Sequence, residues 1–212
     1  RADLSNAVFP WLSGKIIDVN LAPAMAVRVN FVGELGWELH HPIEYQNHIF
    51  DALMSAGVEF GLKPFGIRAM DAMRLEKSYR MVGTEMSIEY AALESGLDRF
   101  VQLQKPDFIG RSGLLAWQEK GFANSFVTLA VKDTTDRDVI GGNPIYKEGK
   151  LIGRATSGGY GFRIGKSLAL AMVAPDCTDI GTSLEIDILG DRFAAEIIEE
   201  SPFDPANERL RV

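Results

Sequence analysis

The sequence predicts an α+β fold in which a mixed region is followed by an all-β region. Residues 1–121 show both strand-like and helix-like periods, whereas residues 122–212 show short apolar runs separated by glycine, proline and aspartate. At 212 residues the chain can form one large domain or two small ones. We therefore expect an α+β subdomain over 1–121, followed by a small antiparallel barrel or sandwich over 122–212.

In the first region, alternating polarity predicts two strands. Residues 24–32 alternate in polarity, as is typical of a half-buried strand. One face carries Arg28 and Asn30, and the other is apolar, with Met25, Val27, Val29 and Phe31. After a glycine-rich turn, residues 37–40 are expected to form the returning strand. Helical spacing of apolar residues predicts three helices, over 45–57, 64–79 and 111–120.

In the second region, five apolar or alternating runs predict five strands. These runs are FVTLAVK, KLIGRATS, SLALAMV, SLEIDIL and RFAAEII. Glu148-Gly149 and Gly190-Asp191 are expected to form two-residue hairpin turns, the second with glycine in the first central position.

Composition excludes several classes of protein. The formal net charge is −7 with a pI near 5.0, which argues against nucleic-acid binding because phosphate recognition needs a positive field. No apolar stretch approaches the ~20 residues that span a bilayer, and the first residues do not resemble a signal peptide. With Cys177 as its single cysteine, the sequence can form neither an internal disulfide nor a multi-cysteine zinc site.

Motifs for common chemistries fail on inspection. The segment 157–167 ends in Gly-Lys-Ser but has Tyr160 where a phosphate-binding loop needs glycine, and a strand-like run follows it instead of a helix. Neighbouring His40 and His41 would point to opposite faces of a strand, so no metal site is expected. The residues alone therefore indicate a globular protein of two parts with no recognisable catalytic group.

Four blocks in order resemble one family. They are RVNFVGELGWELHHP (28–42), PFGIRAMDAMRLEKSYRMVGTEM (64–86), ESGLDRFVQLQKPDFIGR (94–111) and SGGYGFRIGKSLALAMV (157–173). Together they resemble the folate-binding aminomethyltransferase family, which includes the glycine cleavage T-protein. The greater similarity is to the C-terminal half of dimethylglycine and sarcosine dehydrogenases, whose tail is similar to SPFDPANERLR (201–211).

The resemblance implies part of a ring of three subdomains, the last a β-barrel, around a tetrahydrofolate site. In this family folate takes up a one-carbon unit from a small methylated amine, giving 5,10-methylenetetrahydrofolate. The resemblance implies that the family's catalytic aspartate lies in the N-terminal subdomain, well upstream of GELGWE (33–38) and before this chain begins, so no catalytic residue is assigned. We expect a missing N-terminal portion of the same protein, with FAD only in such an upstream domain, and no activity from this stretch alone.

The resemblance also implies which residues hold the folate. The second glutamate of the family's G-E-x-G-x-E pattern binds the pterin and falls on Glu38, and a carboxylate suits the paired N–H donors of an aminopyrimidinone ring. His40 shares the strand face of Glu38 and is included in the folate site. Phe31 stands where the dehydrogenases carry an aromatic hydroxyl residue, so it lacks that hydrogen bond, and core packing explains it equally well. For Glu38 the alternative is a solvated strand face.

Other family positions depart from the pattern or admit a structural role. Met70 stands where the T-protein has a folate-binding arginine, and Arg209 falls near its C-terminal aromatic residue. Asp71, Arg74 and Glu76 match the family, but their spacing on one helix suits structural salt links equally well.

Three functions remain open. The first is a folate-binding, one-carbon transfer module of a dimethylglycine or sarcosine dehydrogenase-like enzyme. The second is a stand-alone folate-dependent aminomethyltransferase or demethylase, and the third is a non-catalytic scaffold. The expected partners are folate and a small methylated amine, with neither nucleic acid nor membrane, in the bacterial cytoplasm or the mitochondrial matrix.

Overall fold

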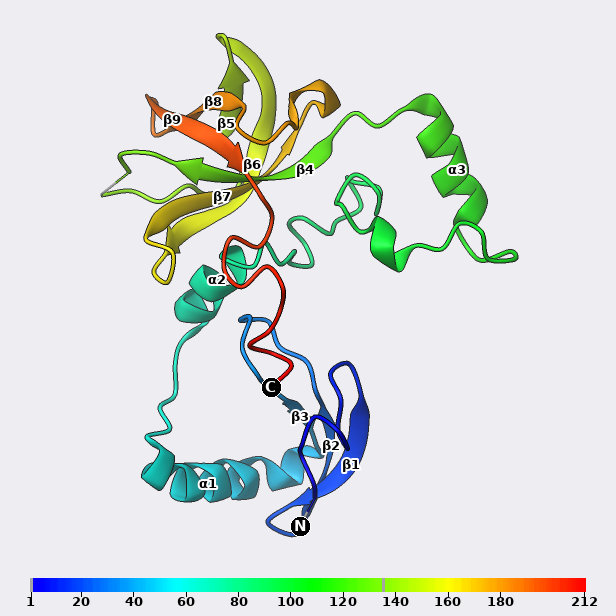
Figure 1. The fold of residues 1–212 in the computed structure, drawn as a ribbon, viewed down its shortest axis with the longest axis vertical. Coiled ribbons are helices and arrows are strands. Elements are labelled where there is room, and N and C mark those ends of the chain that lie inside the picture. Colours follow the sequence, from blue (N-terminus) through cyan, green and yellow to red (C-terminus); the bar gives the residue numbers. More distant parts are fainter. Residues whose placement is uncertain (1, 135) are drawn as a thin grey trace. The chain divides into compact units, whose positions relative to one another are not determined.

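The computed structural model describes residues 2–134 and 136–212, and the chain divides into two compact units. The first unit comprises the chain up to Met70 together with Ala206–Val212, and the second comprises Asp71–Pro205. Figure 1 shows the elements of each unit along the chain. The C-terminal residues thus belong to the same unit as the N-terminal sheet.

The first unit is built on a three-stranded antiparallel sheet. Strands β1 (Gly14–Val19), β2 (Ala22–Val27) and β3 (Glu38–His40) are hydrogen-bonded in that order, so β3 is an edge strand. A 3₁₀ turn over Ile43–Tyr45 then leads into helix α1 (Gln46–Gly57). The sequence predicted β3 and α1 closely, but it did not indicate β1.

Strand β2 is shorter than expected and buries the opposite face. Ala22, Ala24 and Ala26 are buried, whereas Met25 is 41% exposed, so the expected apolar face is wrong. Alternation establishes that a strand has two faces, but here both faces carry apolar residues and the small alanines occupy the buried one. The strand ends at Val27 because a turn begins at Asn30, whose side-chain oxygen accepts the backbone N–H groups of residues 32 and 33.

Helix α2 (Ile67–Leu75) is also shorter than the expected 64–79. The backbone after Leu75 leaves the helix through a turn in which Ser78 has a φ of 53°. Helix α3 (Arg111–Lys120) has the expected bounds, and Gly121, which follows it, has a φ of 87°, a positive value that glycine adopts without strain.

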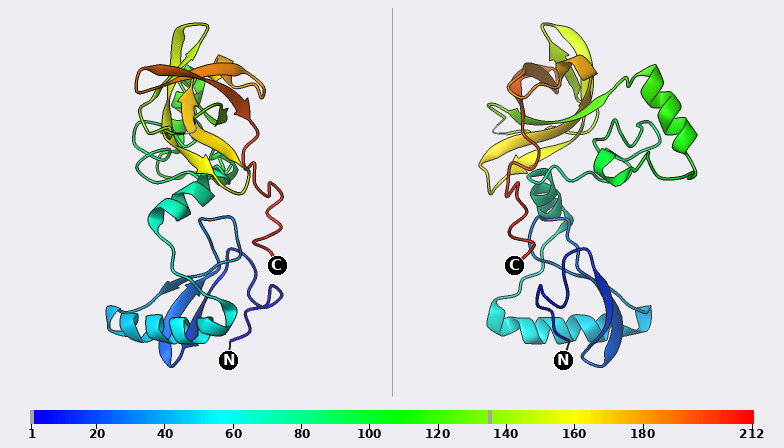
Figure 2. Two further views of the ribbon diagram at one scale, coloured as in Figure 1. Left: turned by 90° about the vertical axis from the view of Figure 1, so that its left-hand side faces the viewer. Right: turned by 45° about the vertical axis from the view of Figure 1, so that its right-hand side comes forward.

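The second unit contains a closed antiparallel barrel, which Figure 2 shows from two further directions. Its strands, in the barrel order β4-β7-β6-β5-β8-β9, are β4 (Ser125–Val131), β7 (Lys166–Val173), β6 (Lys150–Gly161), β5 (Pro144–Lys147), β8 (Ser183–Ile188) and β9 (Asp191–Ile198). The expected all-β region is confirmed as a barrel. Five of its strands match the predicted runs, while the four-residue β5 was missed.

Two hairpin turns test the turn predictions. Glu148 and Gly149 connect β5 to β6 with φ values of 51° and 78°, as expected of a turn that needs positive φ at both central residues. Between β8 and β9 the central residues are Leu189 and Gly190, with φ values of 58° and 93°, because Ile188 pairs directly with Asp191. The predicted Gly190-Asp191 turn was therefore displaced by one residue.

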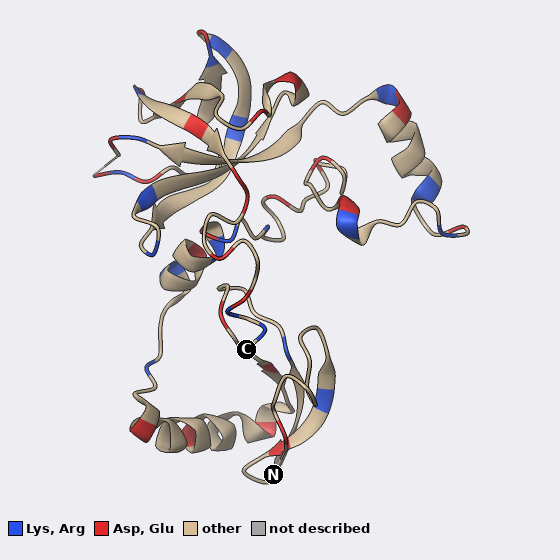
Figure 3. Ribbon diagram, in the orientation of Figure 1, with Lys and Arg blue, Asp and Glu red and all other residues tan. Residues whose placement is uncertain are grey.

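The glycine-rich segment 157–167 forms part of the β6–β7 hairpin. Strand β7 begins at Lys166, so the run after Gly-Lys-Ser is a strand, as predicted, and not a helix. Acidic and basic residues are interspersed along the barrel and its loops (Figure 3). Within the described parts of the chain, no helix combines the length and the apolar character needed to cross a membrane.

Candidate functional site

Strand β3 places Glu38 and His40 side by side on the accessible face of the first unit. Their side chains are 57% and 62% exposed, and Nε2 of His40 lies 3.2 Å from Oε2 of Glu38. This arrangement follows from strand geometry, in which residues two apart point to the same side. Glu38 thus presents two carboxylate oxygens, which accept hydrogen bonds and donate none.

Trp37, the residue immediately before β3, packs against other residues of the first unit. The ring of Trp37 packs edge-on against Phe9 with 6.4 Å between centroids, and the Arg28 guanidinium lies 5.6 Å from the indole centroid. Arg28 is almost completely buried and donates to the carbonyl oxygen of Phe9 at 2.5 Å. Glu38 is therefore an exposed carboxylate directly next to a packed aromatic residue.

Phe31 does not lie on a strand. It is half-buried in the loop 28–37, within the turn that Asn30 closes, so the expected strand face shared with Val27 is wrong. The structure brings Glu38 and His40 together, and it places Phe31 on the loop that leads into their strand. Whether Phe31 contributes to a binding site stays a prediction.

One connection to this loop was missed by sequence reasoning. Nε of Arg209 lies 2.8 Å from Oε2 of Glu34, which joins the C-terminal segment to the loop 28–37. Nη2 of Arg28 also donates to the backbone oxygens of Val212 at 2.8 Å and Leu210 at 3.5 Å. No local sequence pattern predicts these contacts, because the residues that they join lie more than 170 positions apart in the chain.

The family-like residues Asp71 and Arg74 on α2, and Glu76 directly after it, make ion pairs within the second unit. Buried Arg74 donates through Nε to Asp71 at 2.6 Å and reaches Glu85 at 3.4 Å. Buried Glu76 accepts the backbone N–H of Arg163 at 2.6 Å and forms an ion pair with its guanidinium. The predicted salt link on one helix is confirmed for Asp71 and Arg74. Glu76 lies beyond the end of α2 and pairs with Arg163 instead, and Met70 carries no guanidinium.

Glu85 is the most heavily hydrogen-bonded carboxylate of this network. It accepts from Thr156 at 2.6 Å, Thr84 at 2.7 Å and the backbone N–H of Met81 at 2.9 Å, as well as from Ser157. Burial by itself would raise the pKa of Glu85, but these hydrogen bonds outweigh it and lower the pKa below its ordinary value. The residue is thus held as a carboxylate with a structural role.

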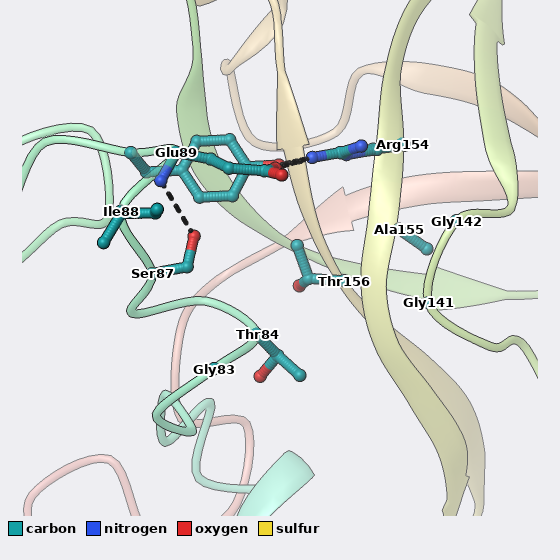
Figure 4. Close-up of a pocket in the computed structure, with 11 residues that line it drawn as sticks. Gly83, Thr84, Ser87, Ile88, Glu89, Gly141, Gly142, Arg154, Ala155 and Thr156 are labelled. Atoms are coloured by element: carbon teal, nitrogen blue, oxygen red, sulfur yellow. Dashed lines mark hydrogen bonds and ion pairs between the residues drawn. The ribbon is translucent and has the colours of Figure 1, made fainter.

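A separate small cavity lies in the second unit and contains none of the predicted site residues. It has a volume of about 270 Å³ and is lined by residues of the 83–90 segment, the two glycines at 141 and 142, and β6. Figure 4 shows Arg154 extending toward Glu89, with which it forms an ion pair. Arg154 also donates to the hydroxyl of Tyr90 at 2.8 and 3.0 Å, so its donors are directed to the cavity wall.

Two other chemistries find little support in the geometry. Burial, followed by the neighbouring Asp176 carboxylate, raises the pKa of the Cys177 thiol, which is unlike an activated nucleophile. Among residues 2–134 and 136–212, no cluster of three or more histidine, cysteine, aspartate or glutamate side chains could hold a metal ion.

The fold agrees with that of a known family. Residues 1–105 match the GCVT N-terminal domain, and residues 124–204 match the glycine cleavage T-protein C-terminal barrel domain. The chain belongs to the glycine cleavage T-protein, or aminomethyltransferase, family, as the four sequence blocks indicated.

Its relatives include both dehydrogenases and transferases. The chain is 42% identical to human mitochondrial dimethylglycine dehydrogenase over 212 residues, which cover 99% of this chain and 24% of the relative. It is 32% identical to human mitochondrial sarcosine dehydrogenase over 218 residues, with coverage of 99% and 24%. It is also 32% identical to the aminomethyltransferase of Desulfitobacterium hafniense over 197 residues, with coverage of 92% and 53%.

A solved structure supports the fold independently. The glycine cleavage system aminomethyltransferase T from Bartonella henselae matches with a TM-score of 0.82 at 21% identity, over 92% of this chain and 53% of that one. The chain thus spans about a quarter of the length of the dehydrogenases and about half of the transferases. It is an aminomethyltransferase-type domain related to dimethylglycine and sarcosine dehydrogenases.

Proposed function

We propose that this chain is the tetrahydrofolate-binding, one-carbon transfer module of a dimethylglycine or sarcosine dehydrogenase-like enzyme. The main support for the proposal is that Glu38 is an accessible carboxylate on β3, directly after the packed Trp37. The 42% identity with human dimethylglycine dehydrogenase over the full length of the alignment favours this branch of the family.

The donor and acceptor chemistry of β3 fits folate. The aminopyrimidinone edge of a pterin presents neighbouring N–H donors, and Glu38 offers two acceptor oxygens that can receive them as charge-assisted bonds. His40 lies 3.2 Å from the same carboxylate and would limit its rotation. Phe31, on the adjoining loop, would add an apolar surface without a hydroxyl.

When bound, tetrahydrofolate would supply the nitrogen atoms that take up the one-carbon unit, giving 5,10-methylenetetrahydrofolate. The part of this chain would be to bind and orient the pterin through Glu38. We assign no catalytic acid or base to the chain. The one-carbon donor would be a small methylated amine, and a flavin, if the enzyme uses one, would belong to another domain of a longer polypeptide in the mitochondrial matrix or the bacterial cytoplasm.

Two alternatives have specific support. The match to the Desulfitobacterium hafniense aminomethyltransferase, of which the chain spans 53%, would suit a stand-alone transferase or demethylase without a flavin domain. The Met70 and Phe31 departures would suit a scaffold that binds no folate. The length of the natural polypeptide separates the first alternative from the leading proposal, and folate binding excludes the second.

The proposal is tested by Glu38→Gln in the full-length polypeptide, with tetrahydrofolate binding measured by calorimetry. The amide would set a donor against a pterin donor, and losing one charge-assisted bond in a closed complex should weaken binding about 30- to several-hundred-fold. Glu44→Gln, an exposed change just beyond β3, is the matched control and should leave affinity unchanged. Binding of folate by Glu38→Gln within about threefold of the unaltered protein would instead place Glu38 on a solvated strand face.

A further inference from the structure

The C-terminal segment 206–212 returns to the sheet that carries Glu38. It belongs to the first compact unit together with β1, β2 and β3. Two side chains connect it to the loop 28–37, which joins β2 to β3: Arg209, which pairs with Glu34 at 2.8 Å, and Arg28, which donates to the backbone oxygens of Leu210 and Val212. The segment is therefore bound at both a side chain and its backbone.

Both connections reach residues that precede Glu38 in the chain or contact the residue directly before it. Glu34 lies four residues before it on the loop 28–37, and Trp37, which immediately precedes it, packs against Arg28. The intervening loop is compact, because a Cβ at Gly36 would lie 3.3 Å from the Asn30 Cβ and 3.4 Å from the Val29 carbonyl oxygen. A shift of Glu34 would therefore be transmitted to the start of β3.

Strand β3 needs such support. It has three residues and, within residues 2–134 and 136–212, pairs only with β2, so few ladder hydrogen bonds fix its position. A recognition carboxylate must be held to within about 0.5 Å of its productive position to bind a rigid heterocycle well. The connections through Glu34 and Arg28 supply constraints that the short ladder lacks.

We propose that residues 206–212 form a strap that positions Glu38, with Arg209 as a positioning residue acting through Glu34. The inference rests on the proposed folate-binding role of Glu38 and adds the element that sets its geometry. Arg209 and Glu34 are 58% and 34% exposed, and an exposed ion pair contributes little to global stability. Losing the pair should therefore change ligand affinity more than it changes unfolding.

The test is a charge swap in the full-length polypeptide, read out as tetrahydrofolate affinity and melting temperature. Arg209→Glu and Glu34→Arg should each weaken binding about five- to twentyfold, and the double variant should recover to within about threefold, as coupled residues do in a double-mutant cycle. Arg209→Lys should retain part of the affinity. Arg211→Gln is the matched control, because Arg211 lies on the same segment but stacks on Trp11, 5.2 Å away, and should leave affinity unchanged.

A second cycle distinguishes positioning from stability. In a Glu38→Gln background, Arg209→Glu should cause less than about a twofold further loss, because the residue it positions is already altered. Three results would each overturn the strap. They are an undiminished loss of affinity from Arg209→Glu in the Glu38→Gln background, failure of the charge swap to recover affinity, and an equal loss of affinity in Arg209→Glu and Arg211→Gln. If Glu38→Gln weakens binding and Arg209→Glu does not, the strap alone is wrong. If neither weakens binding, the proposed function fails, and the strap with it.

Discussion

Glu85 is a buried carboxylate that accepts hydrogen bonds from several parts of the second unit. Its carboxylate joins the 81–85 turn to Thr156 and Ser157 on β6, and Arg74 approaches the same oxygen that accepts from Met81 and Thr84. A buried carboxylate with this many donors stabilises the fold only while it remains ionised.

We expect Glu85→Gln to destabilise the protein by about 2–4 kcal/mol at pH 7, because it removes charge-assisted bonds and leaves buried Arg74 with less compensation. The sign of the pH dependence follows from the lowered pKa of Glu85 in the folded state. Its contribution is complete above the unfolded-state pKa of ~4.3 and is lost as the pH falls through the lower folded-state value.

Urea unfolding of the unaltered protein and of Glu85→Gln at several pH values between about 7 and 3 measures this contribution. The difference in unfolding free energy between them should shrink toward the acid end. Glu119→Gln, on the exposed surface of α3, should follow the unaltered protein throughout. A difference that stays constant with pH would contradict the account of Glu85.

At the residue scale, local sequence patterns predicted part of the candidate site. Strand alternation was enough to place Glu38 and His40 on one face, and helical spacing was enough to pair Asp71 with Arg74. Arg209 was noted only as a departure from a family pattern, because its partner Glu34 is brought close by tertiary folding. Such long-range pairs lie outside what periodicity can reveal.

Strands β6 and β7 approach each other so closely at Gly153 that there is no room for a Cβ atom there. A Cβ at Gly153 would lie 2.2 Å from the Met172 carbonyl oxygen and 2.7 Å from the Val173 Cα, both of which are backbone atoms of β7. These atoms cannot move aside without separating the two strands that close this part of the barrel.

Gly153→Ala should therefore destabilise the second unit by about 1–3 kcal/mol through overpacking. Gly113→Ala is the matched control, since nothing lies within 4 Å of a Cβ there, and alanine in α3 should be neutral or up to about 1 kcal/mol more stable. Thermal unfolding of both variants gives the comparison. Equal melting temperatures for the two would show that the β6–β7 contact relaxes freely.

At the element scale, strands and turns were predicted most accurately where typical turn residues separate apolar runs. Glu148-Gly149 was located correctly, whereas the β8–β9 turn was displaced because Leu189 adopts a left-handed conformation that its residue type does not suggest. The buried face of β2 was inverted because alanine carries little hydrophobic signal, although it permits close packing. These errors arise where packing overrides residue preference.

At the scale of the whole molecule, the chain can be divided at two places. The sequence predicts a boundary near residue 121, the family domains match 1–105 and 124–204, and the compact units divide at Met70 and Asp71. The joint at 121–124 is held by Glu94, whose Oε1 accepts the backbone N–H groups of Ala123 at 3.2 Å and Asn124 at 3.0 Å. By contrast, residues 61–66 are exposed and outside any helix or strand.

Limited chymotrypsin digestion should consequently cleave after the exposed Phe65 before it cleaves after Phe122. The sequence-based expectation is cleavage at 121–124 or in the 133–142 loop, in which residue 135 lies outside the described residues. Glu94→Ala should accelerate cleavage after Phe122 without affecting cleavage after Phe65, and mass spectrometry of the early fragments identifies the order. Early cleavage after Phe122 in the unaltered protein, with the bond after Phe65 intact, would favour the boundary near 121.

Function at the molecular scale depends on whether the exposed face of β3 receives a pterin. The most direct measurement is a crystal structure of the full-length polypeptide with tetrahydrofolate bound. We expect the aminopyrimidinone edge of the pterin within hydrogen-bonding distance of both Glu38 carboxylate oxygens, with Arg209 still paired to Glu34. A pterin bound elsewhere, with Glu38 facing solvent, would contradict the proposed function.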